Sequence, residues 1–117
     1  MTEIKRQPTH PGKILREDFL TPLGLSQTEP AVMLKTTFRT VNEILNEKKG
    51  ISPEMAVRLA RFVGTSEELW LNLQDQYDLY RVKEKKRAEL GKIIPYKKLG
   101  KIAQGINKKV IILFHYE

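Results

Sequence analysis

The segment SQTEPAVMLKTTFRTVNEIL, residues 26–45, decides the fold, because it predicts two short helices joined by a very short turn. The first helix should begin at Ser26, where Glu29 three residues later completes the pattern of a capping box. The second should begin at Thr37, a residue type that caps the amino terminus of a helix well. Only a few residues around Lys35 remain between them, which is the spacing of a helix-turn-helix unit.

The second helix of this unit carries the residues expected to recognise a base sequence. In helix-turn-helix proteins this helix lies in the major groove and its first residues touch base edges. Leaving out its apolar face, the residues expected to face DNA are Thr37, Phe38, Arg39, Thr40 and Glu43. Arg39 could contact guanine with two hydrogen bonds, and Phe38 could pack on a thymine methyl group. Thr40 could make either kind of contact, and Glu43 could accept from cytosine or repel a misplaced phosphate.

Contacts with DNA phosphates are expected at the edges of the unit. Gln27 and Thr28 lie at the start of its first helix, where free amides and the helix dipole attract anions. Lys48 and Lys49 follow its second helix and could reach the same backbone. Such contacts fix the register of the protein on the duplex without reading its sequence.

Each of these features also has an interpretation without DNA. Two capped short helices occur in many all-α proteins. Taken alone, Arg39 could be a solvated surface residue, Phe38 could belong to the core, and the two lysines could be a polar end to the helix. Spacing by itself therefore leaves DNA binding as one of several interpretations.

Three further helices are predicted around the unit. One should follow His10 with an apolar stripe, and should end over Thr21-Pro22-Leu23-Gly24, since proline breaks the hydrogen-bond ladder and glycine accepts a left-handed turn. Another should begin with Ser52 as cap and Pro53 in the first turn, and should end at Gly64. The last should open with a second capping box in Thr65-Ser66-Glu67-Glu68. The predicted class is therefore all-α, with five helices in residues 1–90.

The core is expected on the apolar stripes of these five helices. Its predicted members are Ile14, Leu15, Phe19, Ala31, Leu34, Val41, Ile44, Leu45, Ala56, Leu59, Ala60 and Val63. The apolar side of the fifth helix is wider than one small core needs. A tryptophan at core spacing is usually buried in the core. Part of this side could still form a dimer seam, and the candidates are Trp70, Leu73, Tyr77 and Tyr80.

The positive charge of the chain is concentrated at its carboxyl end. The formal charge is +7, yet residues 1–80 sum to −1 and residues 81–117 to +8. Residues 91–117 are expected to form a basic extension, in which Val110–Phe114 could be a short strand. This extension could be solvated, could contact phosphates, or could fold on a partner protein by adding a strand to it.

Several classes of protein are disfavoured. There is no cysteine, and the two histidines, His10 and His115, lie at opposite ends without metal-ligand spacing. No phosphate-binding glycine loop occurs, and Ser26 and Ser66 are explained as helix caps. We therefore expect neither enzyme activity nor a cofactor. No signal peptide or membrane span can be identified, so a cytoplasmic protein is expected.

Two segments resemble a known family: HPGKILREDFLTPLGLSQTE, residues 10–29, and VNEILNEKKGISPEMAVRLARFVGTSEELWLNLQDQYDL, residues 41–79. They resemble the HigA, or virulence-associated protein I, family of addiction-module antitoxins within the Xre-type helix-turn-helix group. The resemblance implies a five-helix, lambda-repressor-like dimer that binds a palindromic operator and represses its own operon. It also implies sequestration of a partner toxin, typically a ribosome-dependent mRNA endonuclease of the RelE type. A stand-alone phage or plasmid repressor without a toxin is the alternative.

The chain departs from the usual family pattern at three positions. Pro30 replaces an aliphatic residue, and Lys35 and Glu47 stand where glycine is common. If Lys35 and Glu47 adopt positive φ angles, each costs on the order of 1 kcal/mol. A less stable or slightly rearranged unit is therefore expected.

Overall fold

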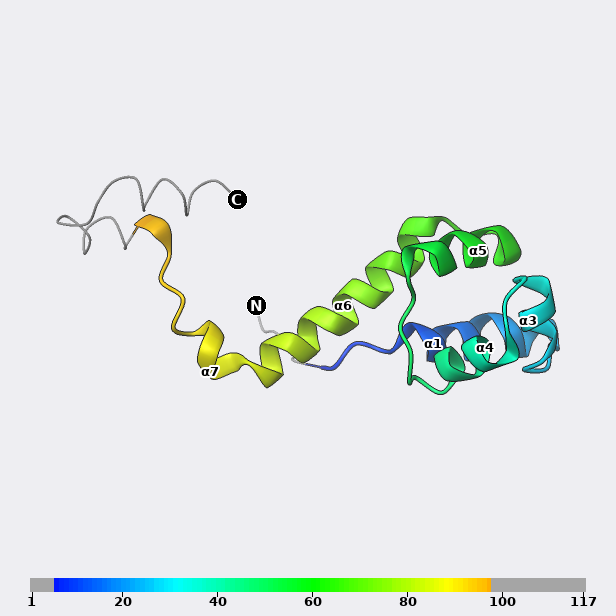
Figure 1. The fold of residues 1–117 in the computed structure, drawn as a ribbon, viewed down its shortest axis with the longest axis horizontal. Helices are drawn as coiled ribbons and strands as arrows, with labels where there is room; N and C mark the ends of the chain where they lie inside the picture. Colours follow the sequence, from blue (N-terminus) through cyan, green and yellow to red (C-terminus); the bar gives the residue numbers. More distant parts are fainter. Residues whose placement is uncertain (1–5, 98–117) are drawn as a thin grey trace. The chain divides into compact units, whose positions relative to one another are not determined.

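The computed structural model describes residues 6–97, and the elements that they form are helices (Figure 1). The order is α1 (Pro11–Ile14), the π-helix η1 (Leu15–Leu20), α2 (Thr21–Leu23), α3 (Glu29–Met33), α4 (Phe38–Leu45), α5 (Pro53–Val63), α6 (Glu67–Lys85) and α7 (Arg87–Leu90). The chain divides into two units whose boundary lies between Val82 and Lys83. The all-α class is confirmed for the described part, and the segment Val110–Phe114 lies outside it.

The first predicted helix runs through α1, η1 and α2 without a break. It ends at Gly24, whose φ of 70° is left-handed, as predicted. Pro22 does not end it, however, so that part of the prediction is wrong. The turn before Pro22 is a π-helix, in which the Thr21 amide donates to the carbonyl of Arg16. In a regular α-helix the proline ring would clash with the carbonyl four residues earlier, and a π-turn is one arrangement that accommodates such a break.

Helix α3 begins two residues later than the capping box predicted, because its cap position is Thr28 rather than Ser26. The Ser26 amide donates to Glu29 Oε1 at 2.9 Å, which is one half of the box. The Ser26 hydroxyl pairs instead with the hydroxyl of Thr28 at 3.0 Å, and no side-chain cap bonds the first turn of α3. A helix starting after Ser26 would need the amide of residue 30 for its first ladder bond, and Pro30 has no amide hydrogen. Pro30 therefore lies in the first turn of a shorter helix, where its missing donor costs little.

The caps of α4 and α5 are confirmed. Thr37 Oγ1 accepts the Thr40 amide at 3.1 Å. Ser52 Oγ accepts the Met55 amide at 3.1 Å, and α5 ends at Gly64 with a φ of 76°.

The capping box predicted for α6 is wrong, although the helix begins where expected. Ser66 Oγ accepts the Leu69 amide at 3.1 Å, so Ser66 is the cap. A capping box needs a glutamate or glutamine three residues after the cap, and that position is Leu69. Thr65 has another role, since its hydroxyl accepts a bond of 2.8 Å from Trp70 Nε1. This bond satisfies the only polar atom of an otherwise apolar side chain in the core.

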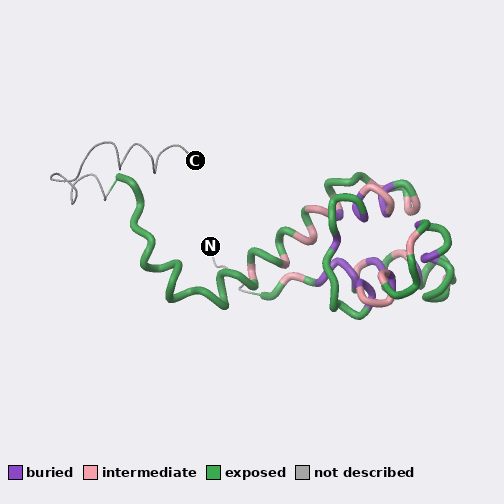
Figure 2. Tube along the Cα trace, viewed as in Figure 1, coloured by how far each residue is buried: buried purple, intermediate pink, exposed green. Residues whose placement is uncertain are grey.

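The core lies where α1, η1 and α3 to α6 meet (Figure 2). Its buried residues are Leu15, Leu20, Ala31, Leu34, Val41, Ile44, Leu45, Ile51, Met55, Ala56, Leu59 and Trp70. The start of α1 approaches α4 closely, because a Cβ atom on Gly12 would lie 1.8 Å from the Ile44 carbonyl oxygen. Only glycine fits there, so Gly12 of the His10-Pro11-Gly12 motif is a packing requirement of the fold.

Candidate DNA-binding surface

The outer face of α4 is exposed, as the sequence predicted. Val41, Ile44 and Leu45 are buried on the inner face. Arg39 lies opposite, with 87% of its side chain exposed, and Phe38 is 47% exposed. The amino-terminal turn of α4 is therefore available to a large ligand, while the back of the helix is fixed by the core.

Arg39 is held by an ion pair on its own helix. Its Nε atom lies 3.2 Å from Glu43 Oε2, one helical turn away. An exposed pair of this kind is worth only about 0.3–0.5 kcal/mol, so Arg39 can leave it at small cost. In the free protein the role of Glu43 is therefore to pair with Arg39 on the surface of α4.

Gln27 and Thr28 are exposed immediately before α3. The Thr28 hydroxyl is bonded to Ser26, and Pro30 contributes no amide, so fewer free donors remain here than the sequence pattern predicted. Both residues are exposed, but they precede α3 instead of forming its first turn, and this segment is poorer in donors than predicted.

Lys48 and Lys49 are exposed on the loop that follows α4. The loop starts with Glu47 at a φ of 61°, the left-handed angle that the family resemblance had led us to expect. The amides of both lysines donate to the Glu43 carbonyl, at 2.8 and 3.2 Å. The backbone that carries the two ammonium groups is therefore fixed to α4.

Gln74 of α6 secures the far side of this loop, a role that no sequence pattern had indicated. Its Oε1 atom accepts the Ile51 amide at 2.7 Å, and its Nε2 atom donates to Asp78 at 2.9 Å. The amide group also packs against Gly50, where a Cβ atom would lie 2.9 Å from it. Gln74 thus sets the position of the loop relative to the core.

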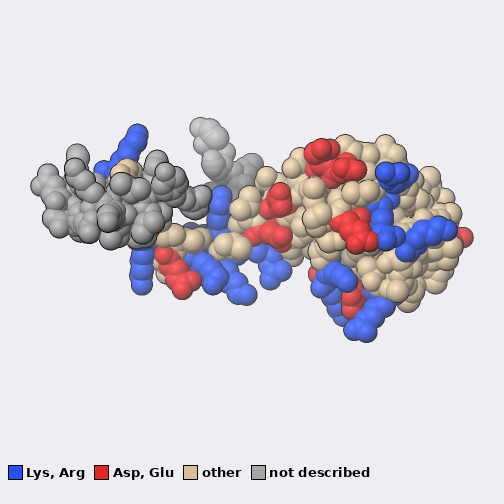
Figure 3. All heavy atoms as spheres, turned by 45° about the horizontal axis from the view of Figure 1, so that its top comes forward, with Lys and Arg blue, Asp and Glu red and all other residues tan. Residues whose placement is uncertain are grey.

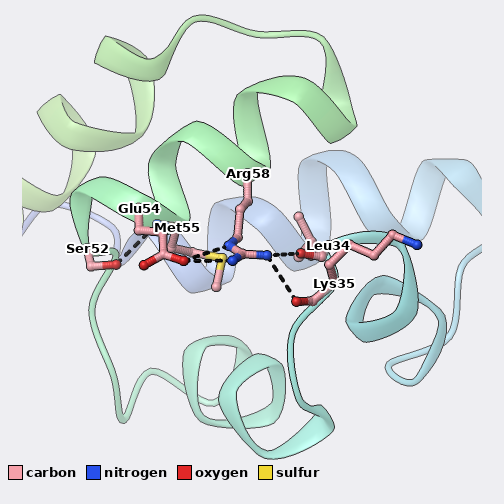
Figure 4. Close-up of polar contacts among 6 residues, drawn as sticks. All are labelled: Leu34, Lys35, Ser52, Glu54, Met55 and Arg58. Carbon is pink, nitrogen blue, oxygen red and sulfur yellow. Dashed lines mark hydrogen bonds and ion pairs between the residues drawn. The ribbon is translucent and has the colours of Figure 1, made fainter.

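Arg58 of α5 supports the turn between α3 and α4 (Figure 4). Its Nη1 atom donates to the carbonyls of Leu34 and Lys35, at 2.8 and 3.0 Å. Its Nε and Nη2 atoms bond Glu54 Oε2 at 3.2 and 2.6 Å. Lys35 has a φ of 57°, as predicted for a turn position where glycine is usual. The only sequence signal for this arrangement was a Glu54–Arg58 pair at helical spacing.

A second arginine supports the other end of α4. Arg16 Nη1 donates to the carbonyl of Leu45 at 2.5 Å. The last carbonyls of a helix have no partner within it, so this bond satisfies one of them. Arg16 thus bonds the last residue of α4, and Arg58 bonds the turn that precedes this helix.

Of the four residues expected in a dimer seam, Trp70 is excluded. Its side chain is 0% exposed within one chain, packed near Phe19 at 5.4 Å between ring centroids, so it offers no surface to a partner. Leu73, Tyr77 and Tyr80 are partly exposed. Tyr77 meets the edge of the His10 ring at 4.8 Å, and the Arg81 guanidinium lies 5.6 Å from the Tyr77 ring centroid.

His10 is a buried helix cap. Its Nδ1 atom accepts the Gly12 amide at 2.8 Å, which requires an unprotonated Nδ1. Burial lowers the pKa of His10, nearby Arg81 lowers it further, and Glu47 and Asp78 partly oppose the shift. Within residues 6–97 no cluster of His, Asp or Glu has the arrangement of a metal site. The same part of the chain holds no helix long and apolar enough to cross a membrane.

Comparison with known proteins agrees with this geometry. A family model described as helix-turn-helix matches residues 15–70. Virulence-associated protein I of Dichelobacter nodosus is 42% identical over 86 residues, which cover 74% of this chain and 79% of the relative. The uncharacterised HTH-type transcriptional regulator YbaQ of Escherichia coli K12 is 39% identical over 95 residues, 80% of this chain and 84% of the relative.

A solved structure of the Pseudomonas aeruginosa antitoxin HigA with the higBA promoter is similar in fold. It is 40% identical, with a TM-score of 0.73, and the match covers 75% of this chain and 97% of that chain. About a quarter of the present chain therefore lies beyond the part shared with that antitoxin.

Proposed function

The chain belongs to the helix-turn-helix family that includes virulence-associated protein I and the HigA antitoxins, and from this premise we propose that it is a DNA-binding antitoxin of HigA type. The observation that supports DNA binding best is the exposed amino-terminal turn of α4. Arg39 stands on it at 87% exposure, and the opposite face of the helix is buried. A helix presented in this way can enter the major groove of DNA with its first residues against the base edges.

In the proposed complex α4 lies in the major groove. Arg39 leaves Glu43 and bonds a guanine edge, with Phe38 against a neighbouring methyl group. Thr37, Thr40 and Glu43 contribute the remaining contacts to bases. Gln27, Thr28, Lys48 and Lys49 contact phosphates and fix the register.

We further propose that the protein acts as a symmetric dimer on a palindromic operator. A two-fold dimer presents two α4 helices to successive major grooves, about 34 Å apart. Leu73, Tyr77 and Tyr80 are the proposed contacts, since each is partly exposed on α6. Trp70 is not among them.

The antitoxin role includes repression of the protein's own operon and neutralisation of a RelE-like, mRNA-cleaving toxin. We expect no enzyme activity of its own and a cytoplasmic location. The alternative is a stand-alone repressor. It draws support from YbaQ, whose description names transcriptional regulation and no toxin.

The DNA claim is tested by footprinting the DNA upstream of the gene with purified protein. We expect a protected palindrome with half-sites one helical turn apart, and weaker protection by Arg39→Ala. Equal affinity for this DNA and for a scrambled duplex would contradict the proposal.

The toxin claim is tested by expressing each neighbouring gene alone and together with this chain. Growth arrest by one neighbour, relieved by the wild-type chain and by Arg39→Ala, would support the antitoxin role separately from repression. If no neighbour is toxic, the stand-alone repressor is the better description.

A further inference from the structure

The positive charge of the described chain lies outside the helix-turn-helix unit. Residues 6–82 contain ten basic and ten acidic residues, so their formal charge is zero. Residues 83–97 contain six basic and two acidic residues, giving +4. Sequence-independent affinity for DNA comes mainly from basic groups at phosphates. Because residues 6–82, which contain the helix-turn-helix unit, have no net charge, much of this electrostatic affinity must come from another part of the chain.

Within residues 6–97, only two of the six basic residues of the segment 83–97 form an ion pair. Arg87 pairs with Glu84 at 2.7 Å, and Lys86 lies 3.7 Å from Glu89. Among the described residues, nothing forms an ion pair with the other four, which are Lys83, Lys85, Lys92 and Lys97. All four side chains are exposed, and Figure 3 shows basic groups projecting from this segment.

Helix stability explains only part of this arrangement. Lys83 and Lys85 lie in the last turn of α6, where the helix dipole favours a positive charge. Lys92 and Lys97 follow α7, a helix of four residues whose dipole is small. Arg81 and Lys85 also stand four residues apart, a like-charge spacing that weakens a helix. The pattern therefore carries more positive charge than the local fold needs.

We propose that Lys83, Lys85, Lys92 and Lys97 form a basic segment that binds the phosphate backbone of DNA without sequence preference. The proposal rests on the DNA binding proposed above, and assigns its electrostatic part to residues outside the helix-turn-helix unit. The chemistry fits this partner, because a lysine ammonium is a compact charge on a flexible stem. It can meet closely spaced phosphates without the fixed geometry that reading a base requires.

The test compares three full-length proteins: the wild type, a variant with all four lysines changed to Gln, and a matched control with the same four changed to Arg. Binding to the operator and to a scrambled duplex is measured over a range of salt concentrations. The Gln variant should lose affinity for both duplexes by the same factor. Its slope of log affinity against log salt should be shallower by about 0.9 for each lost contact, so up to about 3.6 per chain. The Arg control should keep the wild-type slope.

An unchanged slope in the Gln variant would overturn the proposal, and would leave an acidic protein as the remaining partner for these lysines. A loss confined to the operator would also overturn it, because the contacts would then be sequence-specific. If the Gln variant unfolds, Lys92→Gln with Lys97→Gln, which lie outside α6 and α7, should still give about half of the change in slope. A wild type that binds both duplexes equally would count against the proposed function, while the slopes would still report on the lysines.

Discussion

The guanidinium of Arg58 donates to the carbonyl of Lys35 at 3.0 Å, and Lys35 is one of two non-glycine residues with a positive φ in the described chain. A left-handed residue turns its carbonyl away from the hydrogen bonds of the preceding helix. Arg58 bonds that carbonyl and the carbonyl of Leu34, while Glu54 holds the rest of the guanidinium. The angle between α3 and α4 thus depends on a side chain from α5, which is not part of the helix-turn-helix unit.

Arg58→Ala should weaken operator binding and lower stability. Hydrogen bonds to a charged donor are worth about 1.5–3 kcal/mol, and the 35% exposure of the Arg58 side chain places the loss at the lower end. Thermal unfolding followed by circular dichroism measures the stability, and fluorescence anisotropy measures the affinity. Arg58→Lys should recover part of the stability and part of the affinity. A lysine ammonium can bond one carbonyl, but it cannot bond both carbonyls and Glu54 at once as the planar guanidinium does. Equal loss of affinity for operator and scrambled DNA would argue against a role in positioning α4.

Lys35→Gly should raise the melting temperature. It removes a left-handed strain on the order of 1 kcal/mol, partly offset by the greater entropy of glycine in the unfolded chain. A gain of 1 kcal/mol corresponds to roughly 4–8 °C for a domain of 60–100 residues. Differential scanning calorimetry would measure it. Lys35→Ala is the control, because alanine keeps the strain and should give no increase.

Near-neighbour patterns predicted much of the local structure, although neither capping box, at Ser26 or at Thr65–Glu68, forms as predicted. The caps at Thr37 and Ser52 and the end of α5 at Gly64 each follow from a few adjacent residues. The positive φ angles of Lys35 and Glu47 were expected from the family resemblance instead, because that family commonly has glycine at both positions. The buried faces of α4 and α5 follow from helical spacing in the same way.

What the sequence did not predict joins residues far apart. Arg58 and Leu34 are separated by 24 positions, Arg16 and Leu45 by 29, and Gln74 and Ile51 by 23. In each pair a long polar side chain bonds a backbone group, and every residue type has a backbone. The type of the partner residue therefore gives no indication of the pairing. Trp70 was wrongly predicted to lie in a dimer seam for a related reason. The sequence shows that α6 has a broad apolar side, but not which residues of that side the other helices of the same chain bury.

Arg39→Ala should reduce operator affinity by about 1–3 kcal/mol and relax sequence preference at one base pair. It should leave the melting temperature nearly unchanged, because the exposed pair with Glu43 contributes little to stability. Competition assays with operators altered at single positions would locate that base pair. Glu43→Gln serves as the control that removes the ion pair but keeps Arg39. A uniform decrease on every duplex would instead identify Arg39 as a phosphate contact.

Stability should fall in mildly acidic solution because of His10. Burial holds its pKa in the folded protein below the ordinary value of 6.5. Well above pH 6.5 His10 is neutral in both the folded and the unfolded state, so it has no effect on the pH dependence there. As the pH falls below 6.5 the unfolded chain takes up a proton that the folded protein excludes, so the free energy of unfolding decreases until the folded pKa is passed. Protonation also removes the acceptor that the Gly12 amide uses. The free energy of unfolding should be measured by denaturant titration between pH 8 and pH 5 for the wild type and for His10→Asn. Asparagine keeps a capping acceptor but does not titrate, so the difference between the two proteins separates the effect of His10 from that of all other titrating groups. If both proteins lose stability equally over this range, His10 is not the group responsible.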